Sequence, residues 1–148
     1  LPWRDIPYDE VADLPAEIDP AYVTLRAIEW NQDRLEKGFS PYSSNILAYI
    51  LSGNTYAATQ FIEDPIQRGK RKNRLEASPY FAVLQSLRGS DKTIHRIIDR
   101  LLGEEFTYIE SITFDKDGGG EITYETPLLT EKGKSQVQSG QYINMELQ

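Results

Sequence analysis

The sequence predicts an α+β protein in which helices come first and a β-hairpin or small meander follows. Between about residues 20 and 102, signals for helix starts and stops flank apolar residues at helical spacing. After Gly103 the pattern changes, and apolar and polar residues alternate with the period of two that is typical of a half-buried strand. A chain of 148 residues is long enough to bury a core as one domain, with room for an appendage.

The first segment of the chain, residues 1–19, is rich in proline and acidic residues. Proline fixes its own φ and disfavours helix at the residue before it, so the segment is predicted to be an extended acidic arm. Its large apolar side chains would hold it against a surface; they are Trp3, Ile6, Tyr8 and Leu14.

The first predicted helix begins after this arm. Asp19 is a favoured N-cap residue, and Pro20 fits the first helical position. The helix is expected to run to about Lys37, with Gly38 as its C-terminal stop.

Four further helices are predicted from the same kind of punctuation. A Ser-Pro pair opens two of them, a third ends before Pro65, and Ser90 or Asp91 caps the last. Their expected ranges are 40–53, 55–64, 78–89 and 90–103.

The strands are predicted on either side of a glycine-rich turn, over residues 105–115 and 120–129, with a further strand over 141–147. The stretch DKDGGGEITYE, from Asp115, resembles a calcium-binding loop. It lacks side-chain oxygen at Gly119 and a closing glutamate at Thr126, and its flanks alternate like strands. The stretch is therefore predicted to be the tip of a hairpin, with no metal.

The charge of the protein is segregated along the chain. Its net value is −7, but residues 1–66 carry −7, residues 67–100 carry +6, and residues 101–148 carry −6. The basic middle contains the run QRGKRKNR, and such clusters favour contact with nucleic-acid phosphates. The alternative is a solvated, mobile loop. The candidate phosphate contacts are Arg68, Lys70, Arg71, Lys72 and Arg74.

The predicted helix over 90–103 has an apolar face made by Ile94, Ile97, Ile98, Leu101 and Leu102. The opposite face is expected to carry Lys92, Thr93, His95, Arg96 and Arg100.

This helix, the turn before it and the strands after it resemble winged helix-turn-helix DNA-binding proteins. The resemblance covers about residues 78–134, and includes Ser90, Thr93-Ile94, Arg96-Ile97-Ile98 and the Leu-Thr-x-x-Gly run within LLTEKGK at 128–134. It implies that Lys92, Thr93, His95 and Arg96 face a DNA groove and that the hairpin is the wing. The acidic tip of that hairpin leaves open a contact with protein instead.

Several functional classes receive no support from the sequence. The chain has no cysteine and a single histidine, His95, which excludes disulfides, thiolate metal sites and multi-histidine metal sites. No apolar run approaches the roughly 18 to 20 residues that cross a bilayer, and a secretory signal pattern is absent. We therefore expect a cytoplasmic protein that is not an enzyme and uses no cofactor.

Two hypotheses follow for the function. The first is a DNA-binding regulatory or accessory protein with an arm (1–19), a helical region (20–66) and a winged-helix-like region (67–148), in which the N-terminal helices could form a dimer. The second is a structural or assembly protein, such as a subunit of a phage particle or other large complex, that uses the arm and the hairpin for protein contacts. Under both, a homo-oligomer or larger protein assembly is expected.

Overall fold

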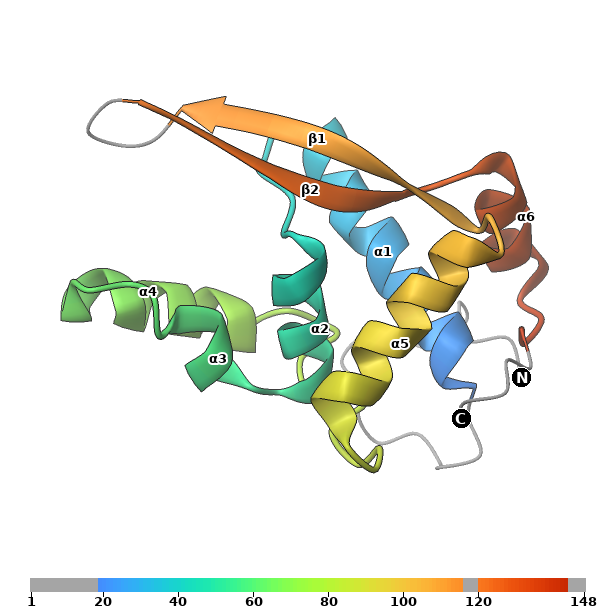
Figure 1. Cartoon of the computed structure of the whole chain (residues 1–148), viewed down its shortest axis with the longest axis horizontal. Coiled ribbons are helices and arrows are strands. Elements are labelled where there is room, and N and C mark those ends of the chain that lie inside the picture. Colours follow the sequence, from blue (N-terminus) through green and yellow to red (C-terminus); the bar gives the residue numbers. More distant parts are fainter. Residues whose placement is uncertain (1–18, 116–119, 144–148) are drawn as a thin grey trace.

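The computed structural model describes residues 19–115 and 120–143, and within them it is an α+β fold of six helices and one antiparallel pair of strands (Figure 1). The predicted arm, the hairpin tip at 116–119 and the end of the chain lie outside the described residues. The elements in order are α1 (Pro20–Glu36), α2 (Ser44–Ser52), α3 (Thr55–Thr59), α4 (Pro65–Glu76), α5 (Ser90–Gly103), β1 (Thr107–Asp115), β2 (Glu121–Leu129) and α6 (Glu131–Ser139).

The helix α1 forms as its end signals predict. The carboxylate of Asp19 accepts a hydrogen bond from the backbone N–H of Ala21 at 3.1 Å, and Pro20 occupies the first turn. Gly38 follows the helix with φ of +85°, a left-handed conformation that favours glycine. Every residue from Ala21 to Ile28 is buried, so α1 is the central helix of the fold.

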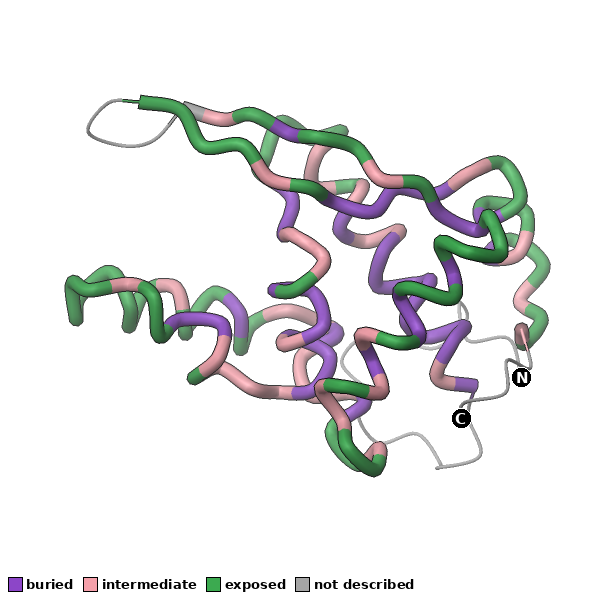
Figure 2. Tube along the Cα trace, viewed as in Figure 1, coloured by how far each residue is buried: buried purple, intermediate pink, exposed green. Residues whose placement is uncertain are grey.

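The core is one continuous cluster around α1, and it includes residues from both the predicted helical region (20–66) and the predicted winged-helix-like region (67–148). Figure 2 shows the buried positions along the chain. Leu47 of α2 and Ile97 of α5 are fully buried beside the α1 residues. The last helix, α6, is held to α1 by a hydrogen bond, which the hydroxyl of Tyr22 donates to the carbonyl oxygen of Val137 at 3.0 Å. The core therefore joins the N-terminal helices to the last helix.

The predicted hairpin is confirmed. Strands β1 and β2 pair antiparallel from Thr107 opposite Leu129 to Asp115 opposite Glu121. In β2 the last four residues are buried and the first five are not, so the hairpin is anchored at one end and projects at the other (Figure 1). A third strand was predicted over residues 141–147. Residues 141–143 are not in a strand, and residues 144–147 lie outside the described part.

The start of α2 differs from the prediction, because Ser43 rather than Ser40 caps it. The intervening residues form no helix, and buried Asn31 binds their backbone at Tyr42. Its side-chain oxygen accepts from the N–H of Tyr42 at 2.7 Å, and its amide nitrogen donates to the carbonyl oxygen of Tyr42 at 2.8 Å. The predicted end at Gly53 is confirmed, with φ of +79°.

The predicted helix over 78–89 is wrong, since this segment is a series of turns. The backbone N–H groups of Ala82 and Leu84 donate to the carbonyl oxygens of Ile50 and Leu51 at 2.7 and 2.9 Å. Ala82 has φ of +61°, which a helix does not allow. The segment therefore satisfies the open carbonyl groups at the end of α2 instead of making its own helix.

Two helices were not anticipated. The basic run, interpreted as a loop, lies in α4, where Asp64 caps the helix and Pro65 begins it. The helix α6 begins where Thr130 accepts from the N–H of Gly133 at 3.1 Å. The helix expected over 55–64 is shorter, because α3 ends at Thr59.

Candidate nucleic-acid interface

The helix α4 projects from the body of the molecule (Figure 1). Leu75 is the one buried residue along its length. Such exposure means that packing against the core contributes little to its stability, and that most of its surface is open to a partner. Its cations divide into two that contact the protein, Arg68 and Arg71, which we call the inner cations, and three exposed ones that make no such contact, Lys70, Lys72 and Arg74, which we call the outer cations. Lys70 and Arg74, four residues apart, share one side of the helix, whereas Lys72 lies on the other.

The inner cations of α4 contact the protein itself. The Arg68 guanidinium donates to the carbonyl oxygen of Ile62 from two nitrogens, at 2.8 and 2.6 Å, and so braces the loop before the helix. The Arg71 guanidinium lies 5.5 Å from the centre of the Tyr42 ring. Four residues beyond Arg71, Leu75 points to the same side of the helix.

The outer cations of α4 are exposed side chains. Within the described part of the chain, the one ion pair is Lys134 with Glu131, and no hydrogen bond involves the side chains of Lys70, Lys72 or Arg74. These three charges are therefore available to an external anion, and they lie within little more than one turn of one helix.

The buried face of α5 forms as the spacing predicts. Ile94, Ile97, Ile98 and Leu101 are all buried in the core against α1 and α2, whereas Leu102, assigned to the same face, is 38% exposed. The helix expected over residues 78–89 as the first half of a helix-turn-helix is absent. Instead, α5 packs on α1 and α2, which come earlier in the chain.

The opposite face of α5 holds only part of the set predicted to contact DNA. Lys92, Arg96 and Arg100 are exposed. The hydroxyl of Thr93 instead donates to the carbonyl oxygen of Arg88 at 2.8 Å, and the His95 ring packs edge-on against Tyr49 with 5.7 Å between centroids. Thr93 and His95 therefore have structural contacts within the protein.

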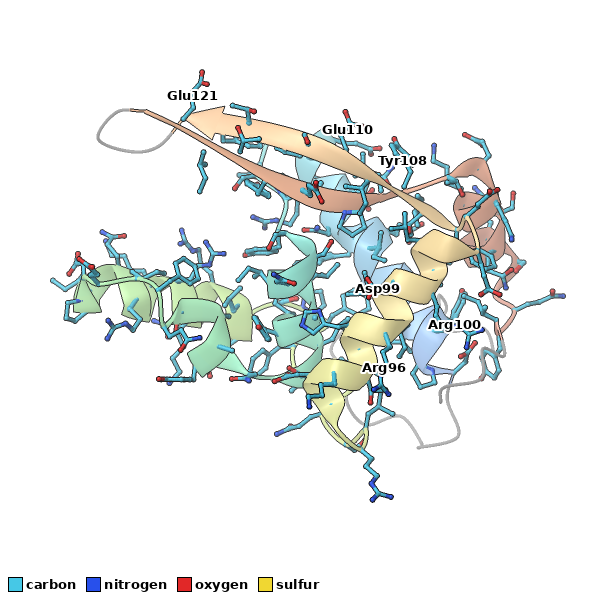
Figure 3. All side chains as sticks on the ribbon, viewed as in Figure 1. Arg96, Asp99, Arg100, Tyr108, Glu110 and Glu121 are labelled. Atoms are coloured by element: carbon cyan, nitrogen blue, oxygen red, sulfur yellow. The ribbon has the colours of Figure 1, made fainter. Side chains whose placement is uncertain are left out.

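The sequence interpretation overlooked a carboxylate on that face. Asp99 is exposed on α5 beside Arg96 and Arg100 (Figure 3). It lies three residues after Arg96, a spacing that places two side chains on the same side of a helix. The sequence alone could have shown this, because Asp99 and Arg96 are three residues apart in a predicted helix. A carboxylate there weakens the attraction of α5 for phosphate.

The projecting hairpin is acidic along its described length. Glu110, Glu121 and Glu125 are exposed, and the first two are labelled on its surface in Figure 3. A hairpin that acted as a wing beside DNA would bring these carboxylates toward phosphates, which like-charge repulsion disfavours. On α4 the outer cations are accompanied by one exposed carboxylate near the end of the helix, Glu76, four residues after Lys72. The acidic hairpin follows α5, not α4, in the chain.

Comparison with known proteins adds no family: no protein-family model matches the chain, and no curated protein matches it in sequence. The winged-helix resemblance thus stays a prediction. Among the described residues, no helix has the length and apolar character needed to cross a membrane, and no group of three potential metal ligands occurs.

Proposed function

We propose that the protein binds nucleic acid through the outer cations of α4. The observation that carries this proposal is a projecting helix whose Lys70, Lys72 and Arg74 are exposed and have no acidic partner among the described residues. An α-helix with side chains is about 10–12 Å across, and the major groove of DNA is about 12 Å wide. The shape and the charge of α4 both suit a duplex.

The proposal moves the main contact from α5 to α4. On α5, Asp99 accompanies the exposed cations, while Thr93 and His95 make contacts within the protein. The acidic hairpin follows α5 directly in the chain and adds further negative charge. Both features disfavour α5 as the principal surface for phosphate.

A triple variant tests the proposal. Replacing Lys70, Lys72 and Arg74 together with glutamine is expected to weaken binding to duplex DNA on the order of a hundredfold at low salt. It should also reduce the slope of log affinity against log salt by about 3, since each lost phosphate contact removes about 0.9. Fluorescence anisotropy of labelled DNA, titrated at several salt concentrations, measures both quantities.

Two matched triple variants remove the same total charge elsewhere. Lys37, Arg88 and Lys134, which are exposed, changed to glutamine report the effect of net charge and are expected to leave the salt slope unchanged. Lys92, Arg96 and Arg100 changed to glutamine report the contribution of α5, which should be smaller than that of α4. A larger loss from the α5 triple, or absence of binding by the unaltered protein at low salt, would contradict the proposal.

Assembly through protein contacts is a second candidate, favoured by large apolar side chains that are open to solvent around α3 and α4. Tyr56 is 75% exposed, Phe61 62% and Ile66 69%. Exposed apolar groups of this size mark protein contacts when they are contiguous. Light scattering after gel filtration tests this candidate: a mass that stays monomeric as concentration rises would count against self-assembly.

A further inference from the structure

A groove of about 310 Å³ lies between α4 and the hairpin, which project on the same side of the molecule (Figure 1). Phe114, Ile122 and Tyr124 of the hairpin form one wall, and Phe61 and Arg71 form the other. The floor comes from the loop before α2 and its first turn, namely Ser40, Pro41, Tyr42, Ser43 and Ile46. We call this space the aromatic groove.

The floor and the hairpin wall of the aromatic groove are fixed in place. The Tyr42 backbone is held by Asn31, and its ring stacks on Trp30 with 6.0 Å between centroids and 21° between planes. The Tyr124 hydroxyl donates to the carbonyl oxygen of Pro41 at 2.6 Å. Burial raises the pKa of this phenol, so it remains a neutral donor. The groove is therefore preorganised.

Arg71 is the charged group of the aromatic groove, and its surroundings lack a compensating anion. Its side chain is half-buried, and its Nε is shielded from solvent without a hydrogen-bond partner. Among the described residues no carboxylate lies within 4 Å of the guanidinium. A second cation, Arg34, lies 4.6 Å from the same Tyr42 ring.

An unpaired, half-buried cation has an energetic cost. Charges removed from water are ordinarily paired, because desolvation disfavours the charged form. In agreement, burial lowers the pKa of the Arg71 guanidinium; the nearby cations Arg74 and Arg34 add to this effect, and the phenols of Tyr42 and Tyr124 act against it. An anion bound in the groove beside the guanidinium would offset this cost.

We propose that the aromatic groove is a binding site for a small organic anion, a carboxylate attached to an aromatic or apolar body. Arg71 would bind the carboxylate, and the ring and aliphatic side chains of the two walls would enclose the apolar body. The volume lies at the lower end of the roughly 300–1,000 Å³ range of small-molecule sites, which suits a compact ligand. This inference does not depend on nucleic-acid binding, since it concerns Arg71 and not the outer cations of α4.

Phenylacetate is a suitable probe, with phenylacetamide and acetate as companions that lack the charge or the ring. Chemical-shift titration of the full chain by NMR is expected to show phenylacetate binding at least about tenfold more tightly than either companion, because both the charge and the ring contribute. The shifted resonances should belong to α4, the loop at 40–43 and the hairpin.

Substitutions at the groove distinguish this site from unspecific binding. Arg71→Gln is expected to weaken phenylacetate binding about tenfold or more, whereas Arg88→Gln, an exposed arginine away from the groove, should leave it unchanged. Should Arg71→Gln also lower the melting temperature, Ile122→Ser supplies an independent variant, since Ile122 is a partly exposed wall residue whose loss should reduce affinity for the ring.

Three results would overturn the assignment. These are equal binding of phenylacetate and phenylacetamide, equal affinity of Arg71→Gln and the unaltered chain, or tighter binding of the acidic peptide acetyl-Phe-Asp-amide than of phenylacetate. The last would make the groove a protein-docking surface. The DNA-binding assay tests the outer cations of α4, whereas the phenylacetate titration tests Arg71. One proposal can therefore fail while the other stands.

Discussion

Gly133→Ala is expected to lower the free energy of unfolding by about 3 kcal/mol or more, because there is no space for a methyl group. A Cβ built at Gly133 would lie 2.1 Å from the carbonyl oxygen of Phe106 and 3.1 Å from its carbonyl carbon. These are backbone atoms, and the same oxygen accepts the N–H of Thr130 at 3.2 Å. Relief of the clash would therefore have to move α6 or the α5–β1 connection.

Urea denaturation measures this loss as a shift of the midpoint. Gly69→Ala is the matched control, because Gly69 lies in exposed α4 and nothing stands within 4 Å of the position that its Cβ would take. That change is expected to stabilise the protein by up to about 1 kcal/mol through helix propensity. A Gly133→Ala protein as stable as the parent would show that the two backbones are not in close contact.

Asn31→Ala is expected to lower the free energy of unfolding by about 2–4 kcal/mol, because it removes a fully buried amide that bonds to three groups. Besides its two bonds to the Tyr42 backbone, the amide nitrogen donates to the hydroxyl of Thr126 at 3.3 Å. That hydroxyl also donates to the carbonyl oxygen of Tyr42 at 2.9 Å. Truncation leaves the buried N–H of Tyr42 without this acceptor, which accounts for most of the cost.

Calorimetric or urea unfolding again provides the measurement, with Asn73→Ala on exposed α4 as the control for loss of an asparagine. The control should change stability by less than about 0.5 kcal/mol. If Asn31→Ala unfolded with the same midpoint as Asn73→Ala, the amide would not be what holds α1, the loop at 40–43 and β2 together.

Local signals in the sequence predicted those elements whose ends depend on local chemistry. Asp19-Pro20 marks the start of α1, and Gly53 marks the end of α2, since a cap or a left-handed glycine acts within a few residues. The hairpin followed from alternation on both sides of a glycine turn. The same logic was available for α4, because Asp64-Pro65 repeats the pattern of Asp19-Pro20, but the density of positive charge favoured a loop interpretation.

The failures occur where tertiary hydrogen bonds override the local signal. Both Ser-Pro pairs predicted helix starts, and neither pair starts one. After the first pair, the backbone of Tyr42 bonds to the side chain of Asn31 instead of entering a helix. After the second, the N–H groups of Ala82 and Leu84 bond to the end of α2. No pattern within a short window reports these partners.

The candidate site was predicted by residue type more successfully than by arrangement. The basic run was recognised, but only the tertiary contacts distinguish Arg68 and Arg71 from Lys70, Lys72 and Arg74, and only the fold places Arg71 opposite the hairpin. Likewise the Leu-Thr-x-x-Gly run has a structural basis visible only in three dimensions. Thr130 caps α6, and Gly133 allows α6 to approach Phe106.

The position of α1 at the centre of the core has a consequence for how the protein is made. This helix is synthesised before the elements that cover it, and its contacts close across 95 residues to Thr126 and 115 residues to Val137. Closure of such long loops precedes the gain from the contacts they bring together. Folding should therefore be completed only after nearly the whole described chain has been synthesised. Nascent chains that end before β2 would keep the apolar surface of α1 partly uncovered, a surface on which chaperones act.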